Sequence, residues 1–178
     1  MGKKIKWGIL GSAHIATEHV IPAMLSCQYG EVYAIASRST EKAQNIAEQF
    51  GIPEFYGSYE ELLADKEVDA IYIPLPNHLH VQWAIKALEA DKHVLVEKPV
   101  GLSSKEAERL LQETKKYPHL KVMEAFMYRH HPQWIKVKAL VDQKAIGDIK
   151  TIQSSFSFFE DDPNSIVNSK EFGGGSLM

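Results

Sequence analysis

A run near the amino terminus decides the fold, and it reads Trp7-Gly8-Ile9-Leu10-Gly11-Ser12-Ala13-His14-Ile15-Ala16. It joins a strand-like apolar segment to a helix-like segment, a turn that brings backbone amides and a helix N-terminus onto a diphosphate. Gly11 makes the turn, and Ala16 is small enough for close packing of helix against strand. Ala13 stands where a second glycine is usual, so the fingerprint is a variant. The residues predicted to bind a cofactor here are Gly11, Ser12, Ala13, His14 and Ile15.

Short apolar runs alternate with amphipathic stretches from Ile5 to about Glu124, which predicts an α/β fold with a Rossmann-type doubly wound parallel sheet. The predicted strands are Ile5–Leu10, Val32–Ala36, Glu54–Tyr56, Ala70–Ile73, His93–Val96 and Lys121–Glu124. The predicted helices are Ala13–Ser26, Thr40–Phe50, Tyr59–Ala64, His78–Glu89, Ser104–Lys116 and Pro132–Gln143. Ser39 or Thr40, and Ser103, are placed as N-caps.

The last part of the chain predicts a second domain. Ile152, Phe156 and Phe158 are evenly spaced, so 150–159 is expected to be a strand of a second sheet. No further sequence supplies its partners. We therefore expect a dinucleotide-binding domain over residues 1–125, followed over 126–178 by the start of an incomplete C-terminal α/β domain in a truncated protein.

Composition excludes several classes of partner. Lys and Arg number 20 against 23 Asp and Glu, with no basic stripe, so a nucleic acid partner is not expected. The first apolar run is too short for a signal peptide or a membrane span. Cys27 is the only cysteine, which predicts a cytoplasmic protein with a buried thiol.

The end of the second predicted strand indicates which dinucleotide is bound. Ser37 and Arg38 stand roughly 20 to 30 residues after Gly11, where this fold contacts the adenosine ribose. No acidic residue is present to accept hydrogen bonds from a free 2′-hydroxyl, whereas Arg38 suits a 2′-phosphate. NADP(H) is therefore favoured over NAD(H). The alternative is that Arg38 is an ordinary solvated loop arginine.

The loop after the fourth predicted strand is expected to hold the nicotinamide half of the cofactor, through Pro76, Asn77 and His80. Asn77 could instead be an N-cap for the following helix. His78 and His80 lack a third ligand at suitable spacing, so no metal site is expected.

Glu97 and Lys98 follow the fifth predicted strand, again at the ligand edge of the sheet. Lys98 can hydrogen-bond a substrate hydroxyl or carbonyl and help to move its proton, and Glu97 can tune Lys98 electrostatically. Pro99 fixes the local backbone and could form a cis peptide bond. The alternative is a surface salt bridge at a strand end.

Taken together, these motifs resemble the Gfo/Idh/MocA family, named for glucose-fructose oxidoreductase, inositol dehydrogenase and a rhizopine-catabolism protein. The matching segments are Gly11 to Ala16, Ser37-Arg38, Pro76 to His80, Glu97-Lys98-Pro99 and Met123 to Arg129. The resemblance implies a Rossmann domain followed by an α/β domain whose open sheet packs against another subunit, hence a homo-oligomer.

The same resemblance assigns roles to residues. Lys98 matches the family's catalytic lysine and Glu97 its motif partner. Tyr128, as a further catalytic candidate, and Arg129, as a cofactor ligand, belong with Glu124 to a segment that crosses between the domains beside the nicotinamide. The alternative is a plain interdomain turn with packed aromatics. The family's substrate-binding Asp and its His or Tyr come after the glycine-rich 173–178 segment, so catalysis by this polypeptide alone is not expected.

The leading hypothesis is an NADP-dependent oxidoreductase that transfers hydride between nicotinamide and a sugar, polyol or related hydroxy compound, with dihydrodiol and xylose dehydrogenases the nearest in kind. Two alternatives stay open. One is a non-catalytic nucleotide-binding or regulatory protein on the same fold. The other is an NAD-dependent glycoside hydrolase.

Overall fold

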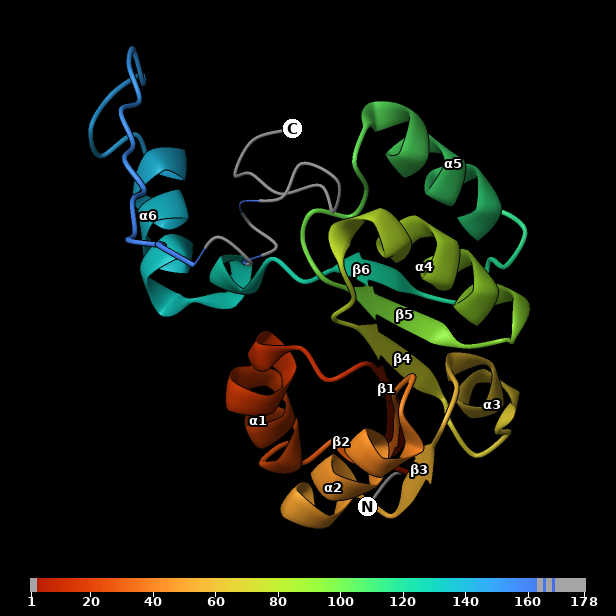
Figure 1. The fold of residues 1–178 in the computed structure, drawn as a ribbon. Coiled ribbons are helices and arrows are strands. Elements are labelled where there is room, and N and C mark those ends of the chain that lie inside the picture. Colours follow the sequence, from red (N-terminus) through yellow and green to blue (C-terminus); the bar gives the residue numbers. More distant parts are fainter. Residues whose placement is uncertain (1–2, 163–164, 166–167, 169–178) are drawn as a thin grey trace.

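The computed structural model describes residues 3–162, 165 and 168, and its central feature is a sheet of six parallel strands (Figure 1). The strands lie in the order β3-β2-β1-β4-β5-β6. Their bounds are β1 Ile5–Leu10, β2 Gly30–Ala36, β3 Glu54–Tyr56, β4 Ala70–Ile73, β5 His93–Val96 and β6 Val122–Glu124. The order reverses between β1 and β4, which confirms the predicted doubly wound Rossmann-type fold.

Helices cover both faces of this sheet. Their bounds are α1 Ile21–Leu25, α2 Thr40–Phe50, α3 Tyr59–Ala64, α4 His80–Glu89, α5 Ser104–Thr114 and α6 Pro132–Asp142, with 3₁₀ turns at Asn77–Leu79 and Met127–His130. One apolar cluster packs α3, α4 and α5 against the sheet, and a second packs α1 and α2 against the other face. Figure 1 shows α6 set apart from the sheet, and none of its residues is buried.

Serine side chains start the helices as predicted. Ser39 Oγ accepts a hydrogen bond from the backbone N–H of Lys42, and Ser103 Oγ accepts one from that of Glu106. The capping role considered for Asn77 is wrong, because Asn77 is already the first residue of the 3₁₀ turn and Pro76 occupies the N-cap position.

The first predicted helix, Ala13–Ser26, is divided. A π-helical turn over Ala16–Val20 leads directly into α1. Pro22 stands in the first turn of α1, has no N–H to donate and crowds the carbonyl one turn earlier. The wider π turn meets this constraint without breaking the path of the chain.

Two predictions are wrong. Residues 150–159 form no strand, because they pair with no other segment of the described chain. Phe156 and Phe159 are accordingly 86% and 87% exposed. The Cys27 thiol is exposed rather than buried, because it follows the end of α1 in the surface turn before β2. The glycine-rich 173–178 segment lies outside the described residues.

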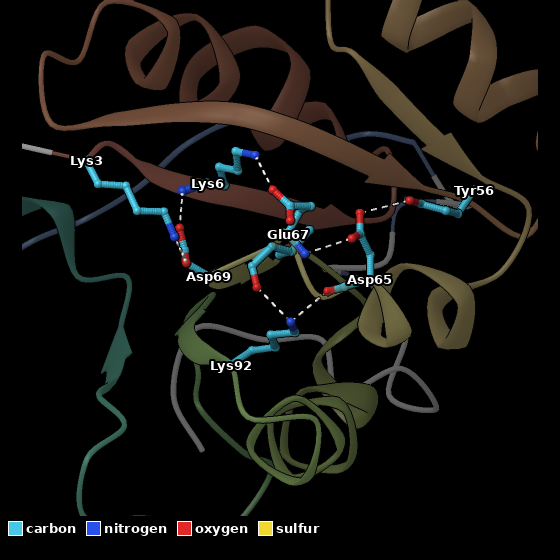
Figure 2. Close-up of polar contacts among 8 residues, drawn as sticks. Lys3, Lys6, Tyr56, Asp65, Glu67, Asp69 and Lys92 are labelled. Carbon is cyan, nitrogen blue, oxygen red and sulfur yellow. Dashed lines mark hydrogen bonds and ion pairs between the residues drawn. The ribbon is translucent and has the colours of Figure 1, made fainter.

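A polar network joins the amino ends of β1, β4 and β5, whereas the predicted ligand site lies at the carboxyl ends of the strands (Figure 2). The buried ammonium of Lys92 donates to the backbone oxygens of Asp65 and Val68, each at 2.7 Å. Asp69 accepts from the backbone N–H of Lys6 at 2.9 Å. Desolvation by burial lowers the pKa of Lys92. These bonds fix the α3–β4 connection, which sets where β4 begins.

Within the described residues, no helix is long and apolar enough to cross a membrane.

Candidate functional site

Five loops, those after β1, β2, β4, β5 and β6, meet at the carboxyl ends of the strands, because these strands are parallel and adjacent. The first residue of the loops after β1, β2 and β5 donates a backbone hydrogen bond to a neighbouring strand. The backbone N–H of Gly11 donates to Ala36 at 2.8 Å, and that of Glu97 donates to Ile73 at 3.1 Å. The backbone N–H of Ser37 donates to Tyr56 at 3.2 Å. These bonds set the starting point of the loops that carry the predicted site.

A first groove of about 530 Å³ runs between the loops after β1, β2 and β4. Its lining residues are Gly11, Ser12, Ala13, Ser37, Arg38, Ser39, Lys42, Tyr59, Pro74, Leu75 and Pro76. Gly11 has φ +98°, and a Cβ built there would come within 3.0 Å of Leu75 Cδ2. Glycine adopts this backbone conformation freely. Because it has no side chain, it also leaves open space in the groove that a Cβ would partly fill.

The far end of this groove is basic. Arg38 is exposed, and Lys42 lies in the first turn of α2 beside it. Burial raises the pKa of the Tyr59 hydroxyl, and the positive charge of Arg38 partly offsets this rise, which places the two groups within electrostatic reach. Sequence reasoning missed both Lys42 and Tyr59. Lys42 could have been identified from its spacing, because it stands four residues after Arg38, which is about one helical turn. Ser39 already predicted where that helix begins.

A second groove of about 540 Å³ continues along the same edge. Its lining residues are Ala13, Ile15, Pro74, Leu75, Asn77, Glu97, Lys98, Pro99, Ala125, Phe126, Met127, Tyr128 and Phe156. Lys98 is exposed, and the Lys98–Pro99 peptide bond is cis. Tyr128 is half exposed and stacks edge-on against Phe126 and Trp134. The structure therefore brings Lys98, Glu97 and Tyr128 to one groove.

Glu97 is 8% exposed and hydrogen-bonded on both oxygens. The Tyr72 hydroxyl donates to Oε1 at 2.7 Å, and the backbone N–H of Lys98 donates to Oε2 at 3.2 Å. Glu97 forms no salt bridge with Lys98, the alternative that the sequence left open, since its two oxygens accept from Tyr72 and from the Lys98 backbone. Glu97 is held by a buried tyrosine instead, which sequence reasoning did not identify.

The loop that follows Glu97 is anchored at two further points. The backbone N–H of Val100 donates to Glu124 Oε1 at 2.8 Å. The ring of His80, fully buried, lies between the backbone oxygens of Leu75 and Pro99. Glu124 and His80 therefore hold the loop in place from β6 and from α4.

Not all predicted site residues reach the grooves. His14 is exposed at the start of the first helical stretch, 4.0 Å from Glu18, and Arg129 is exposed in the turn before α6. Neither of these side chains, nor that of His80, lines a groove. The residue after Arg129, His130, was not among the sequence assignments above, and it lines a separate small apolar cavity together with Tyr72. Among the described residues, no group of three or more His, Cys, Asp or Glu side chains is placed to hold a metal ion.

Comparison with known proteins gives a consistent result. A family model described as an oxidoreductase family with an NAD-binding Rossmann fold, Gfo/Idh/MocA, matches residues 5–126. Oxidoreductase ORF334 of Rhizobium meliloti is 50% identical over 173 residues, which is 97% of this chain and 52% of that protein. D-xylose 1-dehydrogenase (NADP(+)) 2 of Haloferax volcanii is 42% identical, with the same coverage of both chains.

A solved structure matches as well. The structure of KijD10, a 3-ketoreductase from Actinomadura kijaniata in complex with TDP-benzene and NADP, has a TM-score of 0.75 and 40% identity to this chain. The match covers 82% of this chain and 46% of that one. The chain spans about half the length of the curated relatives it matches.

Proposed function

The chain belongs to the Gfo/Idh/MocA oxidoreductase family, and on that premise we propose that it is the NADP(H)-binding part of an oxidoreductase acting on a sugar, polyol or related hydroxy compound. The observation that carries the proposal is the continuity of the two grooves. Both are lined by Ala13, Pro74 and Leu75. One elongated ligand can therefore run from Arg38 to Lys98 across the point where the strand order reverses.

The first groove fits the adenosine diphosphate half. Gly11 lets a diphosphate approach the backbone, and the helical stretch that follows directs its N-terminus at the negative charge. Arg38 and Lys42, with the hydroxyl of Ser37 at the strand end, supply the charge and donors that a 2′-phosphate requires. No carboxylate lines this groove to accept from a free 2′-hydroxyl. NADP(H) is favoured on this ground, and KijD10 also holds NADP.

The second groove fits the nicotinamide and the reacting carbon. Bound NADP(H) would supply or accept a hydride at C4 of its ring. Lys98 is placed to hydrogen-bond the substrate oxygen and to exchange its proton, and Glu97 sets the local charge. Tyr128 lines the same groove and offers a second hydroxyl for proton transfer.

The remaining parts of the proposal rest on the sequence and on the relatives. The relatives include a D-xylose 1-dehydrogenase and a 3-ketoreductase solved in complex with TDP-benzene, which supports a small carbohydrate substrate. We place the boundary of the dinucleotide-binding domain at residue 125, close to the end of the matched family model. A homo-oligomer and a cytoplasmic location remain predictions.

Cofactor binding is tested by fluorescence titration of the chain with NADPH and NADH. We expect tighter binding of NADPH, and Arg38→Ala should weaken it by about 10- to 100-fold while leaving NADH unchanged. Arg109→Ala, on the exposed side of α5, is the matched control. Equal affinity for both nucleotides, or an unchanged Arg38→Ala variant, would contradict the assignment of the 2′-phosphate site.

Catalysis is tested by NADP(H)-dependent turnover of a panel of sugars and polyols by a protein extended to the length of the curated relatives, of which this chain spans about half. Lys98→Ala should lower kcat by roughly 100-fold or more if Lys98 moves the proton. Cofactor binding without turnover of any compound would favour a regulatory protein. Hydrolysis of a glycoside with no net change in NADP(H) would favour the hydrolase.

A further inference from the structure

We propose that Tyr59 is a further cofactor-binding residue, whose hydroxyl donates a hydrogen bond to the 3′ oxygen of the adenosine ribose of NADP(H). The inference rests on the proposed function, because it requires the first groove to hold the adenosine half of the cofactor. Tyr59 is the first residue of α3, and its half-buried side chain lines that groove together with Gly11 and Arg38.

The hydroxyl of Tyr59 lacks the kind of partner that other buried phenols have. Tyr56 donates to Asp65 at 2.9 Å, and Tyr72 donates to Glu97 at 2.7 Å. Within the part of the chain that the structure describes, the Tyr59 hydroxyl makes no hydrogen bond. Every buried side-chain oxygen of the described residues has a partner, so this oxygen is reached from the groove. Burial raises the pKa of the phenol, which therefore keeps its proton at neutral pH and can donate it to a ligand.

The position of this hydroxyl selects one part of the cofactor. A Cβ built on Gly11 would lie 3.6 Å from the Tyr59 oxygen, and the charge of Arg38 acts on the same phenol. Gly11 is the proposed approach of the diphosphate, and Arg38 is the proposed contact of the 2′-phosphate. The adenosine ribose links these two phosphate groups covalently, so it must pass between them, beside Tyr59. Its 3′-hydroxyl is the oxygen that NADPH and NADH share there.

The ring of Tyr59 is held in place from the side of the core. It packs edge-to-face with Trp83, with ring centroids 4.9 Å apart and an interplanar angle of 89°. Trp83 is buried, and the ammonium of Lys86 lies 4.0 Å from the centre of its ring and pairs with Glu60 at 2.8 Å. A ligand therefore meets a hydroxyl that is already positioned. Tyr59→Phe removes the oxygen and keeps the ring in its packing.

Titration with NADPH and NADH separates the role of Tyr59 from that of Arg38. Tyr59→Phe should weaken the binding of both dinucleotides by the same factor, about three- to tenfold, because it removes one hydrogen bond that both form. Arg38→Ala should instead weaken NADPH alone. Tyr117→Phe is the matched control, since Tyr117 is half-buried against the same apolar cluster and lines neither groove. It should bind both dinucleotides as the wild type does.

The contact itself is tested by calorimetric titration with ADP and 3′-deoxy-ADP. The wild type should bind ADP about three- to tenfold more tightly, and Tyr59→Phe should bind the two compounds with nearly equal affinity. A merely structural defect in the variant would weaken both compounds and keep their ratio. A ratio that is unchanged in Tyr59→Phe therefore overturns the assignment. Equal affinities in the wild type would overturn it without any variant.

The outcomes distinguish this inference from the proposed function. If the wild type binds NADPH and Tyr59→Phe binds both dinucleotides equally well as the wild type, the inference fails and the proposed function stands. A loss confined to NADPH also overturns it, because the hydroxyl would then contact the 2′-phosphate. If the wild type binds neither dinucleotide, the proposed function fails, and the inference fails with it.

Discussion

The hydroxyl of Tyr72 donates to Glu97 Oε1 across 2.7 Å, which joins the middle of β4 to the residue before Lys98. Tyr72 is fully buried, and burial together with the Glu97 carboxylate raises the pKa of its phenol. The tyrosine therefore stays a donor at neutral pH. A core residue of the sheet thus determines the position of a carboxylate at its ligand edge.

Tyr72→Phe tests how much this bond contributes. The variant leaves Glu97 with only the backbone N–H of Lys98, and an under-satisfied buried carboxylate should lower the free energy of unfolding by about 1–3 kcal/mol. Urea denaturation measures the loss. Tyr29→Phe, on an exposed ring, is the control and should change stability little. Equal effects of the two substitutions would show that the bond to Glu97 contributes nothing.

The raised phenol pKa values predict a loss of stability at alkaline pH. Tyr56, hydrogen-bonded to Asp65, has its pKa raised by burial and by that carboxylate, as Tyr72 does by Glu97. Above the ordinary phenol pKa of about 10, the unfolded chain loses these protons before the folded chain does, so the free energy of unfolding falls as pH rises. Urea midpoints across this range should fall less steeply for Tyr72→Phe. Parallel curves for variant and wild type would exclude Tyr72 as a contributor.

Gly11→Ala and Gly51→Ala separate backbone strain from loss of the cofactor site. Both glycines have positive φ, +98° and +67°, but only Gly11 has neighbours that an added Cβ would meet. Each substitution should cost about 1 kcal/mol of stability from strain alone. Only Gly11→Ala should also weaken NADPH binding, which titration would measure. Weakened binding in both variants would mean that strain, rather than the groove, is responsible.

Lys92→Met tests the polar network at the amino ends of β1, β4 and β5. The apolar side chain leaves the carbonyls of Asp65 and Val68 buried without their shared donor, so thermal unfolding should show a loss of about 1–3 kcal/mol. Lys66→Met, exposed in the same connection, provides the comparison. If the Lys66 variant lost as much stability, the loss would come from removal of charge and not from these two bonds.

Much of the fold follows from local patterns. β4 and β5 were predicted with their observed bounds, since central strands covered on both faces are mostly apolar; β4 is buried at every position and β5 at Val94 and Val96. Ser103 was recognised as a cap, and Ser39 as one of two candidates with Thr40, because capping depends on a residue and its next three neighbours. The strand predicted over 150–159 failed for the opposite reason. A strand requires a partner elsewhere in the chain, and spacing alone does not provide one.

The site shows the same division. Gly11, Arg38 and Lys98 stand directly after strands, so the parallel sheet places them at one edge. Their supports, such as Tyr72 and Glu124, come from distant elements and have no signal in neighbouring residues. Which polar groups form hydrogen bonds with each other depends on the packing of elements that are distant in the sequence, and no local pattern encodes that packing.

The pairing of β1 with β4 also has a kinetic consequence. Trp7 aligns with Ala70, far along the chain, whereas β1 meets β2 and β4 meets β5 after shorter connections. Closing the longest loop last is the least costly order, so β1 and β4 should come together late in folding. The two grooves meet above this pair, at Ala13 and Leu75. If pairing of β1 with β4 limits the folding rate, the NADPH site is absent before that step. NADPH should then slow unfolding and leave the refolding rate unchanged, which stopped-flow experiments would measure.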